Sequence, residues 1–545
     1  MDIKHPKTRF LPWLLLSILL VLTRLSVAFA DDDRKLDDGL TGEGTFAILV
    51  RCEDQLFKKA GDYEAWAKEH TREKRSVLRA ATVELLRKKS DASWEKLAAS
   101  VQSLEKDGQL QNRLRYWIFN GFACQATAKA AAALAELPEV AFVYKQNSAI
   151  PPQYAVIIQP TENPEPLKKQ LKEVAEAWRD DSQDPLDLKD VEIPWNLQMI
   201  QADKAWKEEH VYGRGVIVAL SDTGIAMIPP LTRALWKNPK AQLSGKDSGH
   251  GYADDLFGWD FRADNNLCLG DGPGMPHGSI CAGIIAGRVV DEKRFITGVA
   301  PRARLMMLRG MASLRSYEYA AINGADVLSM SYMFPGVPLG NYRGVFRLAH
   351  EQLAACGVVA VGGAGNFSQL PEGQQIALPK DIPCVIAAAG VTKDGAKGRV
   401  SSEGPCYWEG VRYYSDYPKD KPLKKPDVTG CFGGYPVWMP GSMEQEQPAL
   451  FAAGPAGRHW NWDWTSKDKS FGLVTGPQGN SFSGPHAAGV AALMLSANPD
   501  LNPWEVKEII EKTCKDLGGS GWDKRFGHGL LQAAEAVKAA KAVKK

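Results

Sequence analysis

The chain has 545 residues, and its composition is that of an ordinary globular protein, with 44% hydrophobic and 24% charged residues. These values exclude a chain that is disordered throughout and a membrane protein with many spans, and the length suggests about three to four structural units. Lysine and arginine number 66 against 64 aspartate and glutamate residues, so the formal net charge is only +2. Overall charge therefore does not favour binding to nucleic acid or to an anionic membrane.

The first 30 residues are typical of a secretory signal peptide. Basic residues at positions 4, 7 and 9 precede a mostly apolar run over 10–22, and Ala28-Phe29-Ala30 supplies small residues of the kind that signal peptidase recognises. A membrane-spanning helix needs about 20 apolar residues, and this run is shorter. We therefore expect an exported protein, secreted or periplasmic, with no membrane attachment once segment 1–30 is removed; an uncleaved anchor is the alternative.

Residues 31–150 are predicted to form a small α+β unit. β-branched and aromatic residues favour strands, whereas the long charged stretch that has few glycines or prolines, and a later alanine-rich stretch, favour helices. The predicted order is a strand, helices, a second strand, a further helix and a last short strand, over 45–51, 63–106, 115–127, 128–137 and 140–144.

The segment 151–190 is rich in proline and charge, as its stretch RDDSQDPLDLKD shows. Such a composition is typical of a surface linker, and one short helix is expected near 167–178. Because proteolytic nicking concentrates in exposed segments of this kind, the linker is the expected processing region.

From residue 191 to residue 545, apolar strands alternate with helices. Strands that are apolar throughout are buried on both faces, which happens when helices cover both sides of a parallel sheet. The predicted fold class of this region is therefore α/β, with a doubly wound, mostly parallel sheet and helices on both faces. Its strands are expected at 215–220, 303–308, 325–332, 357–365 and 384–391.

Three glycine-marked segments carry an aspartate, a histidine and a serine. They are VIVALSDTGI with Asp222, MPHGSICAGIIAG with His277 and GNSFSGPHAAG with Ser481. Each residue alone is more simply explained as a cap or a turn residue. Together they supply the hydroxyl, the imidazole and the carboxylate that nucleophilic serine catalysis requires.

The order of these residues along the chain narrows the class of enzyme. Serine hydrolases of the α/β-hydrolase fold have the order Ser, Asp, His, and chymotrypsin-like enzymes have His, Asp, Ser. The present chain has Asp, His, Ser, and its GNSFSG segment lacks the GxSxG pattern of the α/β-hydrolases. These two families are therefore not favoured.

The segments DTG, HGSICAG and GNSFSGPHAAG resemble the signature motifs of the subtilisin-like serine proteases, the subtilases. The resemblance covers roughly residues 195–537 and implies that Asp222 orients the imidazole, that His277 is the general base and then acid, and that Ser481 is the nucleophile. No cofactor and no metal is implied for the chemistry. Further matching segments are GVAPRARLMMLR, NGADVLSMSY, VAVGGAGNFS, KPDVTG and FGHGLLQAAEAV.

The resemblance also implies an oxyanion donor and a substrate pocket. Asn366, in GGAGNFS, matches the asparagine whose amide stabilises the oxyanion. Two segments, Ser331-Tyr332-Met333 and Gly363-Ala364-Gly365, match the walls of the primary substrate pocket. Many relatives have glycines where this chain has Met333 and Phe334, so bulk is expected either to narrow the cleft or simply to pack in the core.

Two further features concern cysteine and calcium. Ile280 and Cys281 follow His277 in a pattern closer to the kexin-like and proteinase-K-like branches, so Cys281 is either a mercurial-sensitive thiol beside the site or a buried apolar residue. The segment 245–261 resembles an acidic calcium loop, with Asp247, Asp254 and Asp255 as candidate ligands for a structural ion. A solvated acidic turn is the alternative.

The region 31–150 resembles the subtilase prodomain, which acts in relatives as a folding aid and intramolecular inhibitor; a permanent N-terminal domain is the alternative. Segments 407–422 and 435–471 are insertions relative to a minimal enzyme, the second with Trp438, Trp460, Trp462 and Trp464, and either form a lid or partner surface or merely pack.

The sequence as a whole predicts an exported, autoprocessed serine endopeptidase that acts on proteins or peptides through an acyl-enzyme on Ser481. Two alternatives stay open. One is a non-catalytic protein of the same fold whose cleft is blocked by Met333 and Phe334. The other is a serine hydrolase that acts on esters.

Overall fold

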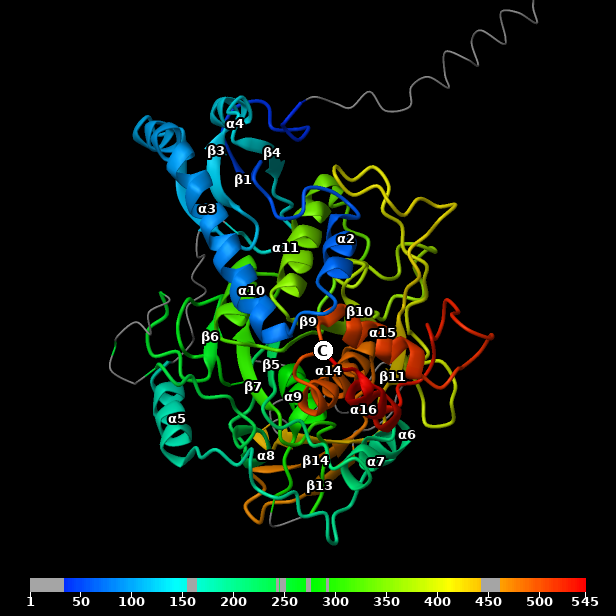
Figure 1. Ribbon diagram of the computed structural model, residues 1–545. Coiled ribbons are helices and arrows are strands. Elements are labelled where there is room, and N and C mark those ends of the chain that lie inside the picture. Colours follow the sequence, from blue (N-terminus) through cyan, green and yellow to red (C-terminus); the bar gives the residue numbers. More distant parts are fainter. Residues whose placement is uncertain are drawn as a thin grey trace, which may run out of the picture.

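The computed structural model describes residues 34–153, 164–241, 245, 251–270, 276–290, 294–442 and 461–545 (Figure 1). The expected signal segment 1–30 lies outside the described residues. An N-terminal unit sits at the top of the view and a larger unit built on a parallel sheet lies below it.

The N-terminal unit is an antiparallel sheet of strand order β2-β3-β1-β4, packed against helices. The expected single strand over 115–127 is wrong: the chain turns at 117–120, where Asn120 has a positive φ of 37° ahead of Gly121. An Asn-Gly pair favours such a tight reversal, which β-propensity alone does not reveal. The elements are β1 (Thr45–Cys52), α2 (Asp62–Glu69), α3 (Arg75–Lys106), β2 (Leu110–Tyr116), β3 (Gly121–Thr127), α4 (Ala128–Ala135) and β4 (Val140–Lys145).

The larger unit contains the predicted doubly wound parallel sheet, with strand order β11-β10-β9-β8-β5-β7-β6. From β5 the chain goes to the edge strand β6, returns through β7, and then crosses to the other side of β5, where β8 to β11 follow in order. Ligands bind in such sheets at the carboxyl ends of the strands near this switch in order. The strands are β5 (Ile217–Asp222), β6 (Gly258–Asp260), β7 (Arg304–Arg309), β8 (Val327–Met330), β9 (Val359–Gly363), β10 (Ile386–Val391) and β11 (Val428–Cys431).

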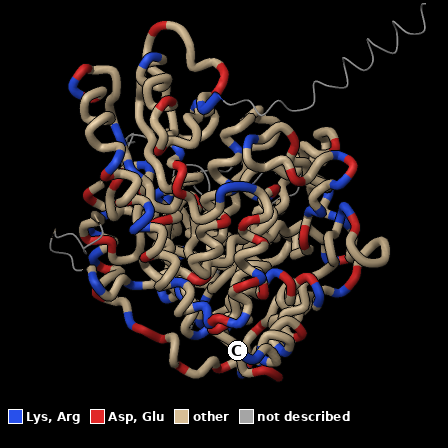
Figure 2. The backbone as a smooth tube through the Cα atoms, turned by 45° about the horizontal axis from the view of Figure 1, so that its top comes forward, with Lys and Arg blue, Asp and Glu red and all other residues tan. Residues whose placement is uncertain are grey.

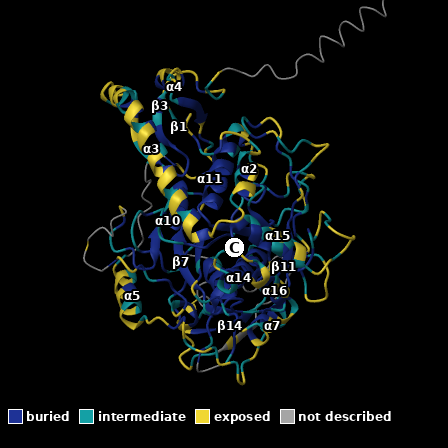
Figure 3. Ribbon diagram, in the orientation of Figure 1, coloured by how far each residue is buried: buried dark blue, intermediate teal, exposed yellow. Residues whose placement is uncertain are grey.

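Helices cover both faces of this sheet, and alternate residues of β5 show why its strands are apolar throughout. Val218 and Leu220 are buried with residues of α9 and α14, whereas Ala219 is buried with residues of α10 and α11. Figure 3 shows α11 and α14 mainly as buried helices. The helices of the larger unit and the segment before it are α5 (Pro164–Ala177), α6 (Trp195–Met199), α7 (Ala202–Lys207), α8 (Pro229–Thr232), α9 (His277–Ala286), α10 (Leu314–Ile322), η1 (Gly340–Tyr342), α11 (Arg343–Ala355), α14 (Asn480–Ala497), α15 (Pro503–Thr513) and α16 (Ala533–Ala542).

The segment expected to be a surface linker is packed onto the larger unit over much of its described length. The indole of Trp178 donates to the carbonyl of Leu235 at 2.9 Å. Asp181 is buried and forms ion pairs with Arg288 at 3.3 Å and with Arg304 at 2.9 Å. One charge of this segment, Asp181, is thus used in buried ion pairs, whereas Arg179 and Asp187 are exposed, as a surface linker predicts.

The described parts of the two insertions pack against the rest of the molecule. Tyr413, in the first, accepts a hydrogen bond on its carbonyl from the Ala60 amide at 2.8 Å and carries the Arg51 guanidinium over its ring. In the second, Trp438 is fully buried against Phe471, and Trp460 lies outside the described residues. This insertion adds a small antiparallel sheet of β12 (Pro436–Pro440), β13 (Asn461–Trp464) and β14 (Phe471–Thr475).

Three further properties of the described molecule are its charge distribution, its cysteines and the apolarity of its helices. Basic and acidic residues are interspersed along the chain (Figure 2), in keeping with the small net charge. All nine cysteines are described, and each is a free thiol. Among the described residues, no helix is long and apolar enough to cross a membrane.

Candidate active site

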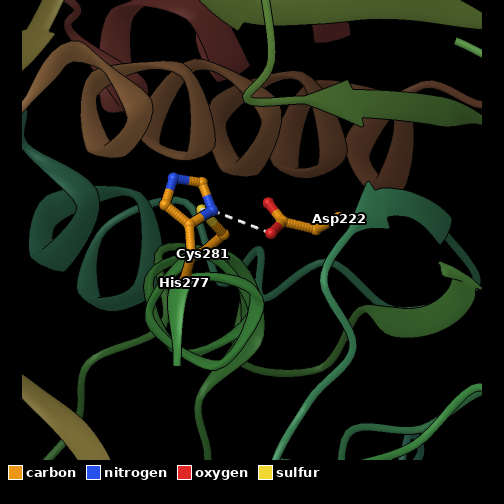
Figure 4. A group of neighbouring side chains, drawn as sticks. All are labelled: Asp222, His277 and Cys281. Atoms are coloured by element: carbon orange, nitrogen blue, oxygen red, sulfur yellow. Dashed lines mark hydrogen bonds and ion pairs between the residues drawn. The ribbon is translucent and has the colours of Figure 1, made fainter. Parts of the chain in front are cut away.

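The carboxylate and the imidazole of the predicted pair meet at the carboxyl end of β5. Asp222 is the last residue of β5, and His277 is the first residue of α9. The His277 Nδ1 atom lies 2.7 Å from Asp222 Oδ1, with Asp222 buried beside it (Figure 4). This contact directs Nε2, the other ring nitrogen, away from Asp222, which is the orientation that a general base needs.

Two motif glycines allow β5 and α9 to approach closely enough for this contact. A Cβ atom on Gly278 would lie 1.9 Å from the carbonyl oxygen of Gly224, so only glycine fits at that point. Thr223 connects the same segments, because its hydroxyl accepts from the Gly278 amide at 3.0 Å. The glycines and the threonine of the DTG and HG motifs therefore allow the close packing that places His277 against Asp222.

Burial and the neighbouring charge shift the pKa of each member of this pair in opposite directions. Burial disfavours the imidazolium, but the Asp222 carboxylate outweighs it and raises the pKa of His277 well above its usual 6.5. Burial likewise opposes ionisation of Asp222, but His277 and the Thr223 amide hold the Asp222 pKa below its usual 3.8. Asp222 is thus a carboxylate at neutral pH, and it stabilises the positive charge that a general base acquires.

Cys281 lies one helical turn after His277 and is part of the same cluster (Figure 4). Its sulfur is 3.9 Å from His277 Nδ1 and 3.6 Å from the carbonyl oxygen of Ser481. Burial raises the pKa of the Cys281 thiol above its usual 9, so it is neutral at neutral pH. Asp222 therefore supplies the negative charge beside His277.

Ser481 is the second residue of α14, the helix that packs against β8, β9, β10 and β11. Its carbonyl accepts a hydrogen bond from the Ser331 hydroxyl at 2.9 Å, which connects the start of α14 to the end of β8. Within the described chain, no hydrogen bond joins the Ser481 hydroxyl to His277. Such bonds are often long before substrate binds, so this geometry does not count against the pair.

Asn366 lies beside the start of α14, after β9. Its side-chain oxygen accepts from the amide of Asn480 at 2.8 Å, so the Asn366 NH₂ is the end left to donate. A Cβ atom on Gly479, the residue before α14, would lie 3.2 Å from that nitrogen. The Asn366 amide and the backbone N–H groups at the start of α14 are therefore neighbours, as an oxyanion site requires.

The two segments matched to a substrate pocket lie on either side of Ser481. Ser331 contacts the Ser481 carbonyl, and a Cβ atom on Gly363 would lie 3.1 Å from the Ser481 amide nitrogen. The sequence motifs do not identify Lys380, which is fully buried and donates from Nζ to the Tyr332 carbonyl. Burial lowers the Lys380 pKa to about 7. A lysine after proline looks like a turn residue, so only its position between the strands reveals it.

The candidate calcium ligands are used in other ways where they are described. Both carboxylate oxygens of Asp254 accept from the Gly245 amide, at 2.9 and 3.0 Å. Asp255 is buried and accepts from the Tyr319 hydroxyl at 2.6 Å, while Asp247 lies outside the described residues. In the described ranges, the only cluster of three histidine, cysteine or acidic ligand atoms is Asp222, His277 and Cys281. The described residues thus do not assemble an acidic calcium site.

Comparison with known proteins finds similarity to proteases. The chain is 25% identical over 357 residues to subtilisin DY of Bacillus licheniformis, which covers 63% of this chain and 98% of the relative. It is 28% identical over 303 residues to the calcium-dependent protease of Trichormus variabilis, covering 48% of this chain and 40% of that protein. Among solved structures, a protease from Pseudoalteromonas arctica matches with 23% identity and a TM-score of 0.42, over 66% of this chain and 97% of that one.

Several relatives are longer than this chain. Its match covers 43% of fervidolysin from Fervidobacterium pennivorans, with 25% identity over 349 residues and 63% of this chain. The family model described as the subtilase family matches residues 213–529, which include Asp222, His277, Asn366 and Ser481. That match spans more than half of the chain, and subtilases are serine endopeptidases. The chain therefore belongs to the subtilase family of serine endopeptidases.

Proposed function

We propose that this protein is an exported serine endopeptidase in which Asp222, His277 and Ser481 form the catalytic triad and Asn366 stabilises the oxyanion. The observation that carries the proposal is the 2.7 Å contact between His277 Nδ1 and the buried Asp222 carboxylate, beside the helix that begins with Asn480 and Ser481. A buried carboxylate that holds an imidazole in this way is the arrangement that activates a serine hydroxyl.

The reaction uses each of these groups in turn. Ser481 Oγ attacks the carbonyl carbon of the scissile peptide bond, and its proton passes to His277 Nε2. The tetrahedral oxyanion accepts hydrogen bonds from the Asn366 amide and the Ser481 N–H. When the carbon–nitrogen bond breaks, His277 gives its proton to the leaving amine. Water, deprotonated by His277, then hydrolyses the acyl-enzyme, and the proton returns to Ser481 as the acid is released.

The N-terminal unit is proposed to act as an intramolecular inhibitor until it is cut from the larger unit between about 150 and 192. Just after this unit, at the start of the connecting segment, Gln153 is buried, accepts from the Leu314 amide at 2.9 Å and donates to the Ala312 carbonyl at 2.9 Å. The Ala312 backbone in turn forms a hydrogen bond with Tyr332, which belongs to one wall of the candidate pocket. The N-terminal unit therefore ends next to the proposed substrate cleft.

The two alternatives make different demands on this site. A non-catalytic binding protein would not need a buried carboxylate on the imidazole, although it would be compatible with the bulk of Met333. An esterase would need the same catalytic groups but not a cleft for an extended chain. Export rests on the N-terminal pattern of 1–30, and a structural calcium ion stays an expectation drawn from the resemblance.

Covalent labelling tests the proposal directly. The purified full-length protein is treated with diisopropyl fluorophosphate, and intact mass and peptide mapping locate the adduct. We expect one adduct, on Ser481, together with loss of hydrolysis of unfolded casein. An unlabelled protein that leaves casein intact would establish the non-catalytic alternative, whereas labelling with hydrolysis of simple esters alone would establish the esterase.

Asp222→Asn is expected to lower kcat/KM by about 10⁴, because an amide at this position holds the imidazole in the wrong tautomer. In the parent, kcat/KM should rise with pH through the His277 pKa, above 6.5, since only the neutral imidazole is a base. In the variant, loss of the carboxylate removes the charge that raises the His277 pKa. The rise of kcat/KM with pH should therefore occur at lower pH than in the parent. Peptide hydrolysis across pH 5 to 10 measures both effects.

A control for this variant is Asp187→Asn, which removes an exposed carboxylate paired with Arg294 at 2.9 Å. It should keep the parent profile. If the Asp222→Asn enzyme had the parent's kcat/KM and the same acidic side of the pH profile, Asp222 would not be the group that orients and charges His277.

Asn366→Leu is expected to lower kcat by roughly 10² to 10³, the size of loss found for the corresponding donor in subtilisin, with a smaller effect on KM. Leucine has a similar shape but removes the NH₂ that faces the start of α14. Steady-state kinetics on one peptide, with thermal unfolding as a check on folding, measures the effect. An unchanged kcat would remove Asn366 from the oxyanion site.

A further inference from the structure

The geometry of attack by Ser481 limits where the substrate side chain next to the scissile carbonyl can lie. Attack requires this carbonyl within about 3–3.5 Å of Ser481 Oγ, so the adjacent side chain must lie near the backbone of Ser481. The segment after β8 contacts that backbone through Ser331, and the end of β9 contacts it through Gly363. We therefore place this side chain between these two segments, which are the ones that the resemblance matches to the primary pocket, and we call the space between them the slot.

Met333 crosses this slot. It belongs to the segment after β8, yet a Cβ atom on Gly365, in the opposite segment, would lie 2.9 Å from Met333 Sδ and 3.1 Å from its Cε. The methionine thioether thus rests directly on the backbone of Gly365. A substrate side chain longer than one or two heavy atoms would need the space that the thioether occupies.

Lys380 fills the interior beneath these segments. Its Nζ donates to the Tyr332 carbonyl of one segment, and a Cβ atom on Gly362, next to the other, would lie 2.2 Å from its Cε. The lysine is fully buried and packs beneath both segments, so its side chain occupies the space under Met333. Phe334, the other bulky residue here, points elsewhere: its ring is 6.2 Å from that of Tyr332, and it lines a separate cavity of about 310 Å³ with Leu378 and Arg343.

On the basis of the proposed endopeptidase function, we propose that Met333 closes the primary pocket and restricts cleavage to peptide bonds that follow glycine, alanine or serine. Met333 is the specificity-determining residue, and Phe334 is not. Each methylene group that a closed apolar pocket must reject costs about 10- to 200-fold in kcat/KM. A leucine or phenylalanine before the scissile bond should therefore be cleaved at least 100-fold more slowly than alanine.

The experiment uses one peptide sequence with glycine, alanine, leucine or phenylalanine before a single scissile bond, and mass spectrometry identifies the bond cut. The parent, Met333→Gly and Phe334→Ala are compared at equal concentrations of Ser481 reactive toward diisopropyl fluorophosphate. We expect the alanine-to-phenylalanine ratio of kcat/KM to be above 100 in the parent and in Phe334→Ala, and below 10 in Met333→Gly. Met333→Ala replaces Met333→Gly if thermal unfolding shows that the glycine variant is unfolded.

The outcomes separate the pocket from the catalytic function. A parent that is labelled and cuts after phenylalanine or leucine as fast as after alanine overturns the pocket assignment alone, because the flexible thioether then moves aside. A Met333 variant that keeps the parent's ratio also overturns it. A parent that is neither labelled nor active overturns the proposed function, and the pocket assignment with it.

Discussion

Replacing Ser481 by alanine is expected to lower peptide hydrolysis by about 10⁶ and to abolish removal of the N-terminal unit. No other group at the site can form the acyl intermediate, because Cys281 is buried below His277 and its sulfur faces the Ser481 carbonyl. Intact mass and N-terminal sequencing, after identical expression and incubation, compare the two proteins. The parent should be cut between about 150 and 192, and the variant should remain uncut.

Ser496→Ala is the matched control for this substitution. Ser496 lies on the same helix, near its other end, and its hydroxyl donates to the Arg214 carbonyl at 2.9 Å. The control should be processed and active like the parent. Processing of the Ser481 variant to the same length, in the absence of any other protease, would show that the nucleophile is misassigned.

Replacing Asp326 by alanine is expected to have the largest effect on stability. This carboxylate is buried before β8, where it forms a salt bridge with Arg75 and lies 3.3 Å from Arg79, both on the first turns of α3. It also accepts from the Ile217 amide at 2.8 Å. Its removal leaves two largely buried guanidinium groups without their counter-charge, which costs about 3–5 kcal/mol.

The measurement is urea unfolding of Asp326→Ala in the Ser481→Ala background, so that self-cleavage does not intervene. Asp500→Ala is the control, because Asp500 pairs at 3.1 Å with the exposed Lys74 at the same contact but is itself only half-buried. Exposed pairs contribute about 0–1 kcal/mol, so the control should unfold close to the parent. Equal, small losses in both variants would show that the buried salt bridge does not hold α3 in place.

The salt bridge at Asp326 affects whether the N-terminal unit stays bound after the chain is cut. Arg75 and Arg79 lie at the amino ends of β8 and β9, whereas Gln153 lies on the side of Tyr332, at their carboxyl ends. The unit is therefore held at both ends of the sheet. A cut in the connecting segment would not by itself break the contact at Asp326, and co-elution of both parts after processing would show that the unit stays as a domain.

The strands and their parallel order could be predicted because apolar runs that alternate with helices have few other arrangements. The structure has β5, β7, β8, β9 and β10 within a few residues of the predicted positions. Predictions from local composition were less accurate: the hairpin over 110–127 looked like one strand, and the composition of 151–190 did not show that Asp181 is buried in ion pairs. Local composition does not show which distant residues a charge will meet.

By itself the sequence determined the fold class, and through its resemblance to the subtilase motifs it predicted Asp222, His277, Ser481 and Asn366 as the site residues that we propose. Only the tertiary structure decided that Met333 rests on Gly365 while Phe334 lines another cavity, and that Lys380 is buried under the Tyr332 carbonyl. The physical reason is that a motif fixes neighbours along the chain, whereas the shape of a pocket depends on contacts between segments that are far apart in sequence and meet only when the sheet is assembled.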